Sequence, residues 1–235
     1  MYARMWIMSY LNIKIKEDFR TLKKGSEYKF DFTDKNYILM VGQNGCGKSS
    51  LINTIRDLKC DNANEYRSGC EAKLGYDTIQ GLKDKVEIET DFKKIFFISS
   101  EFDDPNALNN CASAETMILY GGFGTKSLSN GKRAQTILSK WIIDNKDNWD
   151  DNTLLIFDEI EKGFDMRMQT GIINMFNNFA KTFGVKCLAI THYLLPMLLS
   201  DKVFWFTLGV EINTSDYLYL TTGYKFEKPI KDETT

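Results

Sequence analysis

The sequence predicts an α/β fold in which a mixed central sheet is flanked by helices. Four continuous apolar runs are typical of strands buried on both faces, as in a parallel sheet: residues 37–41, 95–98, 154–157 and 187–190. Segments with helical spacing of apolar residues lie between or beside these runs: residues 49–59, 112–120, 131–144 and 167–179. Period-two alternation at the two ends of the chain predicts N-terminal and C-terminal antiparallel strands.

Taken in chain order, the first elements are strands at 5–16 and 27–32, followed by the buried strand Tyr37–Val41 and a helix with Leu51, Ile55 and Leu58 on one face. Residues 60–94 change to a polar, glycine-containing composition, which predicts an inserted lobe with one strand at Val86–Glu89. After the last buried strand, the stretches VFWFTL and DYLYLTT are predicted to be terminal strands.

Composition indicates an ordinary globular protein. The chain has 235 residues, 43% of them hydrophobic and 26% charged, which excludes wholesale disorder. Its length fits a single domain over residues 1–235, with 60–94 inserted in it. The net charge of −2 gives no sign of a general polyanion-binding surface.

The five cysteines include no C-x-x-C pair, and with a single histidine the chain lacks the ligands for a zinc cluster of the usual spacing. This pattern favours reduced thiols and therefore a cytoplasmic location. The sequence has no signal peptide, and no apolar stretch reaches the ~20 residues that span a bilayer. We therefore expect no membrane insertion.

The strongest functional motif follows the run 37–41. Residues 42–49, GQNGCGKS, match G-x-x-x-x-G-K-S/T between a predicted buried strand and a helix, which is the context of a phosphate-binding P-loop. Backbone N–H groups of such a loop surround phosphates at a helix N-terminus. The lysine reaches the β- and γ-phosphates of a nucleotide, and the serine hydroxyl binds Mg²⁺. The residues predicted to bind the nucleotide here are Gly42, Gln43, Asn44, Gly45, Cys46, Gly47, Lys48, Ser49 and Ser50.

A second motif is the apolar run 154–157 followed by Asp158 and Glu159, the Walker B arrangement. The carboxyl end of a strand is where open α/β sheets hold ligands. Asp158, together with Ser49, is therefore predicted to bind Mg²⁺. Glu159 is predicted to act on the attacking water, either as a general base or as a group that polarises it.

Three further features resemble ATP-binding-cassette (ABC) ATPases. Leu128-Ser-Asn-Gly-Lys132 before a helix is similar to the LSGGQ signature, Asp165 stands seven residues after Asp158 like the D-loop aspartate, and His192 follows a strand like the switch histidine. The resemblance implies ATP and Mg²⁺ as cofactors, ATP hydrolysis, and an ATP-dependent homodimer. It also implies that His192 is catalytic and that Ser129, Gly131 and Asp165 act at the dimer interface, where the two signature residues complete the partner's nucleotide site.

The sequence GQNGCGKSSLINTI looks more specifically like the P-loop of the SMC, RecF and double-strand-break-repair branch. The segment IKIKEDFRTLKKG looks like that branch's N-terminal strand and turn, which makes Arg20 a nucleotide-binding candidate. Asn130 and Lys132 depart from the signature, Ile160 stands where many cassettes have proline, and no glutamine ends the run 95–98. Ser100 or Glu101 is the candidate replacement for that Q-loop glutamine, and the long SMC coiled coil is absent from this sequence.

From this resemblance we predict an ATP-gated head acting in DNA repair, recombination or phage and mobile-element defence, with nucleic acid or a DNA-processing protein as partner. The alternative is the ATP-binding subunit of a membrane transporter, against which the missing Q-loop glutamine argues. A third reading, an AAA+ motor, requires a helical lid, and the predicted C-terminal strands argue against it.

Overall fold

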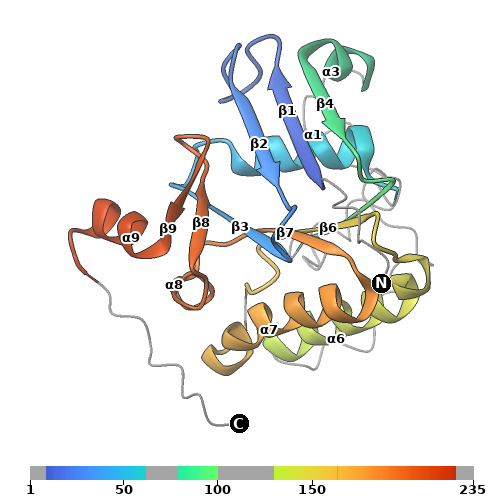
Figure 1. The fold of residues 1–235 in the computed structure, drawn as a ribbon, viewed down its shortest axis with the longest axis vertical. Coiled ribbons are helices and arrows are strands. Elements are labelled where there is room, and N and C mark those ends of the chain that lie inside the picture. The colour runs from blue at the N-terminus through green and yellow to red at the C-terminus, as the bar shows by residue number, and fades with distance from the viewer. Residues whose placement is uncertain (1–8, 62–78, 100–129, 163, 226–235) are drawn as a thin grey trace, which may run out of the picture.

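The computed structural model describes residues 9–61, 79–99, 130–162 and 164–225. These residues form three layers (Figure 1). A three-stranded sheet and helix α1 lie on one face of a six-stranded sheet, and helices α6 and α7 lie on the other. The predicted mixed central sheet flanked by helices is therefore confirmed.

The strands are β1 (Tyr10–Ile15), β2 (Glu27–Asp31), β3 (Tyr37–Val41), β4 (Val86–Thr90), β5 (Lys94–Ser99), β6 (Thr153–Asp158), β7 (Lys186–Ile190), β8 (Lys202–Trp205) and β9 (Val210–Asn213). The helices are α1 (Lys48–Lys59), α3 (Ile79–Lys85), α6 (Asn130–Asn145), α7 (Met166–Phe183), α8 (Leu194–Leu198) and α9 (Thr214–Thr222), with a 3₁₀ turn at Lys146–Asn148.

The central sheet has the strand order β5-β6-β7-β3-β8-β9 and is parallel except for the last pair. Its register places the carboxyl ends of the middle strands side by side, because Ile190 of β7 pairs with Asp158 of β6 and with Met40 of β3. The loops that follow these three strands therefore leave the same edge of the sheet, where α/β proteins hold their ligands.

The small antiparallel sheet has the order β2-β1-β4. Strand β4 and helix α3 come from the range predicted to be an inserted lobe, but β4 pairs with β1 from Leu11↔Thr90 to Ile15↔Val86. Residues 79–94 therefore belong to the main body, and the lobe boundary at residue 94 is wrong. The pairing joins residues about 75 positions apart, so local composition could not indicate it. Residues 62–78 lie outside the described part of the chain.

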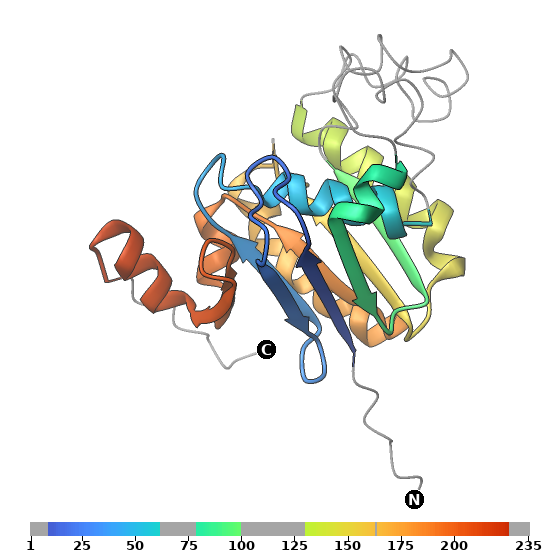
Figure 2. The same ribbon diagram turned by 90° about the horizontal axis from the view of Figure 1, so that it is seen from above.

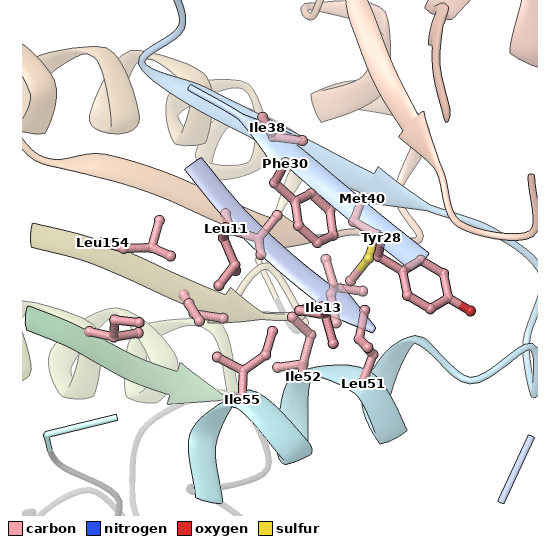
Figure 3. Packing of buried hydrophobic residues seen from close by; sticks show 14 of the residues in the cluster. Leu11, Ile13, Tyr28, Phe30, Ile38, Met40, Leu51, Ile52, Ile55 and Leu154 are labelled. Carbon is pink, nitrogen blue, oxygen red and sulfur yellow. The ribbon is translucent and has the colours of Figure 1, made fainter. Parts of the chain in front are cut away.

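Helix α1 is held between the two sheets by its apolar face. Leu51, Ile52 and Ile55 are fully buried and point toward Leu11 and Ile13 of β1 (Figure 3). Apolar side chains buried in this way each contribute roughly 1.5–3 kcal/mol by removal from water. The helix that begins at the P-loop is thus anchored on a rigid core.

The second core fills the space between the central sheet and helices α6 and α7. Helix α7 buries Ile172, Ile173, Phe176 and Phe179, a spacing that follows one helical face. It begins where the Asp165 carboxylate accepts a hydrogen bond from the Met168 N–H at 2.9 Å, and it ends at Gly184, whose φ of 76° is left-handed. The predicted helix at 112–120 lies outside the described residues.

The C-terminal part corrects one expectation. VFWFTL contains strand β8, which pairs antiparallel with β9, but DYLYLTT forms helix α9 and not a strand (Figure 2). Thr214, Tyr217 and Leu218 are buried at positions i, i+3 and i+4, the spacing of a helical face. Within the described residues, no helix has the length and apolarity needed to span a membrane.

A P-loop cavity as candidate nucleotide site

The loops after β3, β6 and β7 enclose a cavity of about 880 Å³ at the edge of the central sheet. Glycines, hydroxyl groups, positively charged side chains and one carboxylate line it. The lining residues are Arg20, Thr21, Asn44, Gly45, Gly47, Lys48, Ser49, Ser50, Glu159, Lys162, His192 and Tyr193. We call it the P-loop cavity. Its volume falls within the range of small-molecule and cofactor sites.

The P-loop turns sharply from β3 into α1. Gly45 and Gly47 have φ values of 77° and 112°, which L-amino-acid side chains rarely adopt, and Gly47 is the N-cap of α1. This conformation leaves the first backbone N–H groups of α1 without intrahelical acceptors at the cavity, together with the positive end of the helix dipole. The loop is therefore built to receive an anion such as a phosphate.

Replacing Gly47 by alanine is expected to destabilise the fold more than replacing Gly45. A Cβ atom on Gly47 would lie 2.5 Å from Thr21 Oγ1 and 3.1 Å from Leu22 Cδ2, whereas one on Gly45 would have no neighbour within 4 Å. Backbone strain alone costs about 1–3 kcal/mol at such positions, and Gly47→Ala adds the steric clash. Urea unfolding of both variants measures the difference, and equal losses would mean that Thr21 does not pack against Gly47.

Lys48 is 4% exposed, and its ammonium group lies inside the loop. Its Nζ donates to the carbonyl oxygens of Gly42 at 2.8 Å and Gln43 at 2.9 Å and lies 3.8 Å from Cys46 Sγ. Burial lowers the pKa of Lys48, while the nearby Cys46, Glu159 and Asp158 act in the opposite direction. The loop therefore contains a positively charged ammonium group that has lost most of its contact with water. A bound phosphate would compensate for that lost hydration of Lys48.

Glu159 and His192 face each other across the ends of β6 and β7. His192 Nε2 lies 3.0 Å from Glu159 Oε1, and both side chains are about 30% exposed. Burial and the charge of Lys48 lower the pKa of His192, and Glu159 raises it in part. Glu159 has a left-handed φ of 51°, unusual for a residue other than glycine, and its N–H donates to Ile190 O at 3.3 Å. Such strain is common where a side chain is directed into a functional site.

The predicted Mg²⁺ ligands Ser49 and Asp158 both lie near Lys48. Ser49 lies in the first turn of α1 and lines the P-loop cavity, and Asp158 is a 7% exposed carboxylate at the end of β6, close enough to act on the pKa of Lys48. Among the described residues, no three histidine, cysteine or acidic side chains form a metal cage. A hydroxyl and one carboxylate fit Mg²⁺, which usually completes its octahedron with waters and substrate phosphates.

Arg20 lines the P-loop cavity from a tight turn closed by two hydrogen bonds between Phe19 and Leu22, at 2.9 and 3.0 Å. Its φ of 53° is left-handed, and its guanidinium carbon lies 5.7 Å from the centre of the Phe19 ring. The structure thus brings Arg20 to the cavity in which the P-loop lies. Contact with a nucleotide base stays a prediction.

Several predicted site residues are not brought to the cavity. Gly42, Gln43 and Cys46 do not line it, although the first two hold Lys48 through their carbonyl groups. Asp165 is exposed, and its carboxylate caps α7. Ser129 and the proposed Q-loop replacements Ser100 and Glu101 lie outside the described residues, and Gly131 lies in the first turn of α6.

Sequence reasoning missed four residues in and next to this site: Thr21, Lys162 and Tyr193, which line the cavity, and Glu161, a buried residue beside Lys162 in the chain. Each lies within three positions of a residue predicted to belong to the site. That proximity is the only feature of the sequence that could have indicated them. Their contributions depend on how loops from different strands meet.

Comparison with known proteins places this geometry in context. No family model matches the chain. The zinc import ATP-binding protein ZnuC of Vibrio cholerae serotype O1 is 23% identical over 192 residues, which cover 79% of this chain and 68% of that protein. Similar solved structures include an inward-facing metal-chelate type ABC transporter and a nucleotide-free ATP-binding cassette of an ABC transporter. Their TM-scores are 0.55 and 0.53, each at 16% identity, and they cover 92% of this chain and 90% and 96% of their own.

The chain has the fold of an ABC-type ATPase. The same comparisons bear out the predictions of an ATPase and of ATP and Mg²⁺ as its cofactors. A bacterial Atm1-family exporter with ATP bound has a similar fold over 93% of this chain, with a TM-score of 0.54 and 15% identity.

The predicted place within the ABC-type ATPases is wrong. The similar proteins named above are described as ABC transporters or as ATP-binding parts of transporters and not as SMC or RecF heads, so the predictions of DNA repair, recombination or phage defence and of a nucleic-acid partner are not supported. The physical reason is that the residues of a glycine-rich loop with Lys48 and Ser49 are those suited to binding phosphate and Mg²⁺. The sequence of such a loop therefore does not show which class of ATPase it belongs to, a transporter subunit or a DNA-repair protein.

Proposed function

We propose that the chain is the ATP-binding subunit of a membrane transporter and that it hydrolyses Mg-ATP to ADP and phosphate at the P-loop cavity. The observation that carries the proposal is the meeting of Lys48, Glu159 and His192 in one cavity on an ABC-type fold. The similarity to a zinc import ATP-binding protein supports the transporter assignment.

The roles of the residues follow from their chemistry. Lys48 and the N–H groups at the start of α1 bind the phosphates, and Ser49 and Asp158 would hold a Mg²⁺ ion, which would neutralise phosphate charge. Glu159 accepts a proton from the attacking water, and His192, hydrogen-bonded to Glu159, keeps this carboxylate oriented. Arg20 and Ser50 contact the nucleotide from the rim of the cavity.

ATP also drives the association of two copies in this proposal. Asp165 is exposed at the start of α7, away from the cavity of its own chain, which fits a role at an interface with a second copy. Ser129 and Gly131 of one copy then complete the phosphate site of the other. A ligand that contacts both copies binds the dimer better than the monomer and so shifts the association equilibrium.

In this proposal the ATPase acts on the membrane-spanning part of the transporter from the cytoplasmic face of the membrane. Its test is isolation of the tagged chain from detergent-solubilised membranes of the native host, with and without ATP. We expect a protein with membrane-spanning helices to be recovered with it, and reconstitution of the two in proteoliposomes to raise ATP turnover. A chain that stays in the soluble fraction and is stimulated by no membrane protein would contradict the proposal.

A further inference from the structure

Glu161 is a buried acid that the proposed mechanism does not use. It is 2% exposed, and within the described part of the chain its Oε1 atom has no hydrogen-bond partner. It stands three residues after Asp158, between Glu159 and Lys162, both of which line the P-loop cavity. A buried polar group left partly unsatisfied costs free energy, and such groups are few in folded proteins.

The groups around Glu161 belong to the loop after β7, residues 191–193. The Thr191 hydroxyl and the backbone N–H of His192 lie close enough to the Glu161 carboxyl to act on its pKa, which they lower. Thr191 is itself 2% exposed, and its Oγ1 accepts a hydrogen bond from the Tyr193 N–H at 3.1 Å. The carboxyl therefore supports the loop that carries His192 and Tyr193 into the cavity.

Glu161 is equally fixed on its own side. The loop after β6 is a tight turn in which the Lys162 N–H donates to Glu159 O at 3.0 Å and the Phe164 N–H donates to Glu161 O at 2.9 Å. The side chain therefore lies between two loops that follow adjacent parallel strands. Displacement of either loop would separate His192 Nε2 from Glu159 Oε1.

We propose that Glu161 is a positioning residue, whose buried carboxyl joins the loop after β6 to the loop after β7 and so holds His192 against Glu159. The inference rests on the ATP hydrolysis of the proposed function. Burial and the neighbouring Glu159 raise the pKa of Glu161 to about 7, so a neutral carboxyl is accessible near physiological pH. The neutral form avoids a second negative charge beside Glu159. Glutamine, which is neutral and hydrogen-bonds, is its closest substitute.

The test compares Glu161→Gln with Glu161→Met, which fills similar space without hydrogen bonds. We expect Glu161→Met to lower kcat by about 10- to 100-fold, the loss that follows a small misplacement of catalytic groups, with little change in the KM for ATP. Glu161→Gln should retain kcat within about threefold, since neutral hydrogen bonding is kept. Thr214→Val is the matched control, because Thr214 is also 2% exposed and donates a buried hydrogen bond to Ser200 O at 2.8 Å, far from the cavity.

A second readout does not depend on activity. His192 is the only histidine of the chain, so NMR of the untagged, labelled protein reports its imidazole without assignment. Its pKa lies below the ordinary value because of burial and Lys48. Release of the loop in Glu161→Met should therefore raise the pKa of His192 toward that value, while Glu161→Gln and Thr214→Val should leave it in place.

The outcomes separate this inference from the function on which it rests. Wild-type kcat and an unchanged His192 titration in Glu161→Met would overturn the positioning role, as would equal losses in Glu161→Gln and Glu161→Met. A folded wild-type chain that does not hydrolyse ATP would contradict the proposed function, and the His192 titration would still decide what Glu161 does.

Discussion

Lys48→Ala is expected to abolish detectable ATP binding in a protein that still folds. The Lys48 ammonium is the buried cation of the P-loop, held by the carbonyl groups of Gly42 and Gln43, and the β- and γ-phosphates would lie against it. We expect the dissociation constant to rise by at least about 100-fold, which corresponds to ~2.7 kcal/mol. Titration with a fluorescent ATP analogue measures the affinity, and circular dichroism monitors the fold.

Lys186→Ala is the matched control for this variant. Lys186 is also a partly buried lysine whose pKa is lowered by burial, and its Nζ donates to Lys35 O at 2.7 Å, outside the P-loop cavity. The Lys186→Ala protein should lose this hydrogen bond between a lysine and a carbonyl group but should bind the nucleotide with wild-type affinity. Wild-type affinity in folded Lys48→Ala would remove the P-loop from the binding site.

The second large effect is expected for Glu159→Gln. This change removes the carboxylate that faces His192 but keeps its shape, so ATP should still bind while kcat falls by about 10²- to 10⁴-fold, the usual contribution of a general base. Because hydrolysis no longer opens the closed form, the variant with Mg-ATP should migrate as a dimer of about twice the 27.1 kDa chain mass. A phosphate-release assay measures turnover, and light scattering measures mass.

The control is Glu211→Gln, which removes a carboxylate of similar exposure from its ion pair with Lys35, at 2.7 Å on strand β9. It should keep both turnover and the wild-type response of mass to ATP. A Glu159→Gln protein that binds ATP and stays monomeric at every concentration would contradict the homodimer. One that hydrolyses ATP at the wild-type rate would contradict the role of Glu159.

Local pattern was sufficient for the elements that form the centre of the fold. The run YILMV forms a strand that is apolar on both faces, as its composition predicts. Residues 42–49 predict a turn into a helix, because glycine tolerates the positive φ needed at Gly45 and Gly47. The roles predicted for the P-loop, Asp158 and Glu159 rest on residue type and spacing alone. These features identify a phosphate-binding ATPase, but they do not indicate its client.

The segment DYLYLTT shows where local pattern failed. Its alternation of tyrosine and leucine suits a strand, but Thr214, Tyr217 and Leu218 form the buried face of α9, and the Tyr217 ring meets the edge of Trp205 on β8 at a centroid distance of 5.3 Å. Packing against the end of the sheet decides between two conformations that the sequence permits almost equally. The pairing of β4 with β1 could not be predicted from local pattern either, because the two strands are far apart in the chain.

By itself, then, the sequence determined the five parallel strands of the central sheet, though not β9, together with the motif predicted to bind phosphate and the carboxylates that follow β6. Only the tertiary structure decided that Glu159 meets His192, that the Asp165 carboxylate caps α7, and that Glu161 is buried beneath the loop after β7. The physical reason is that motifs depend on local backbone geometry and side-chain chemistry. Orientation, burial and pKa depend instead on the register of parallel strands, which brings together residues far apart in the chain.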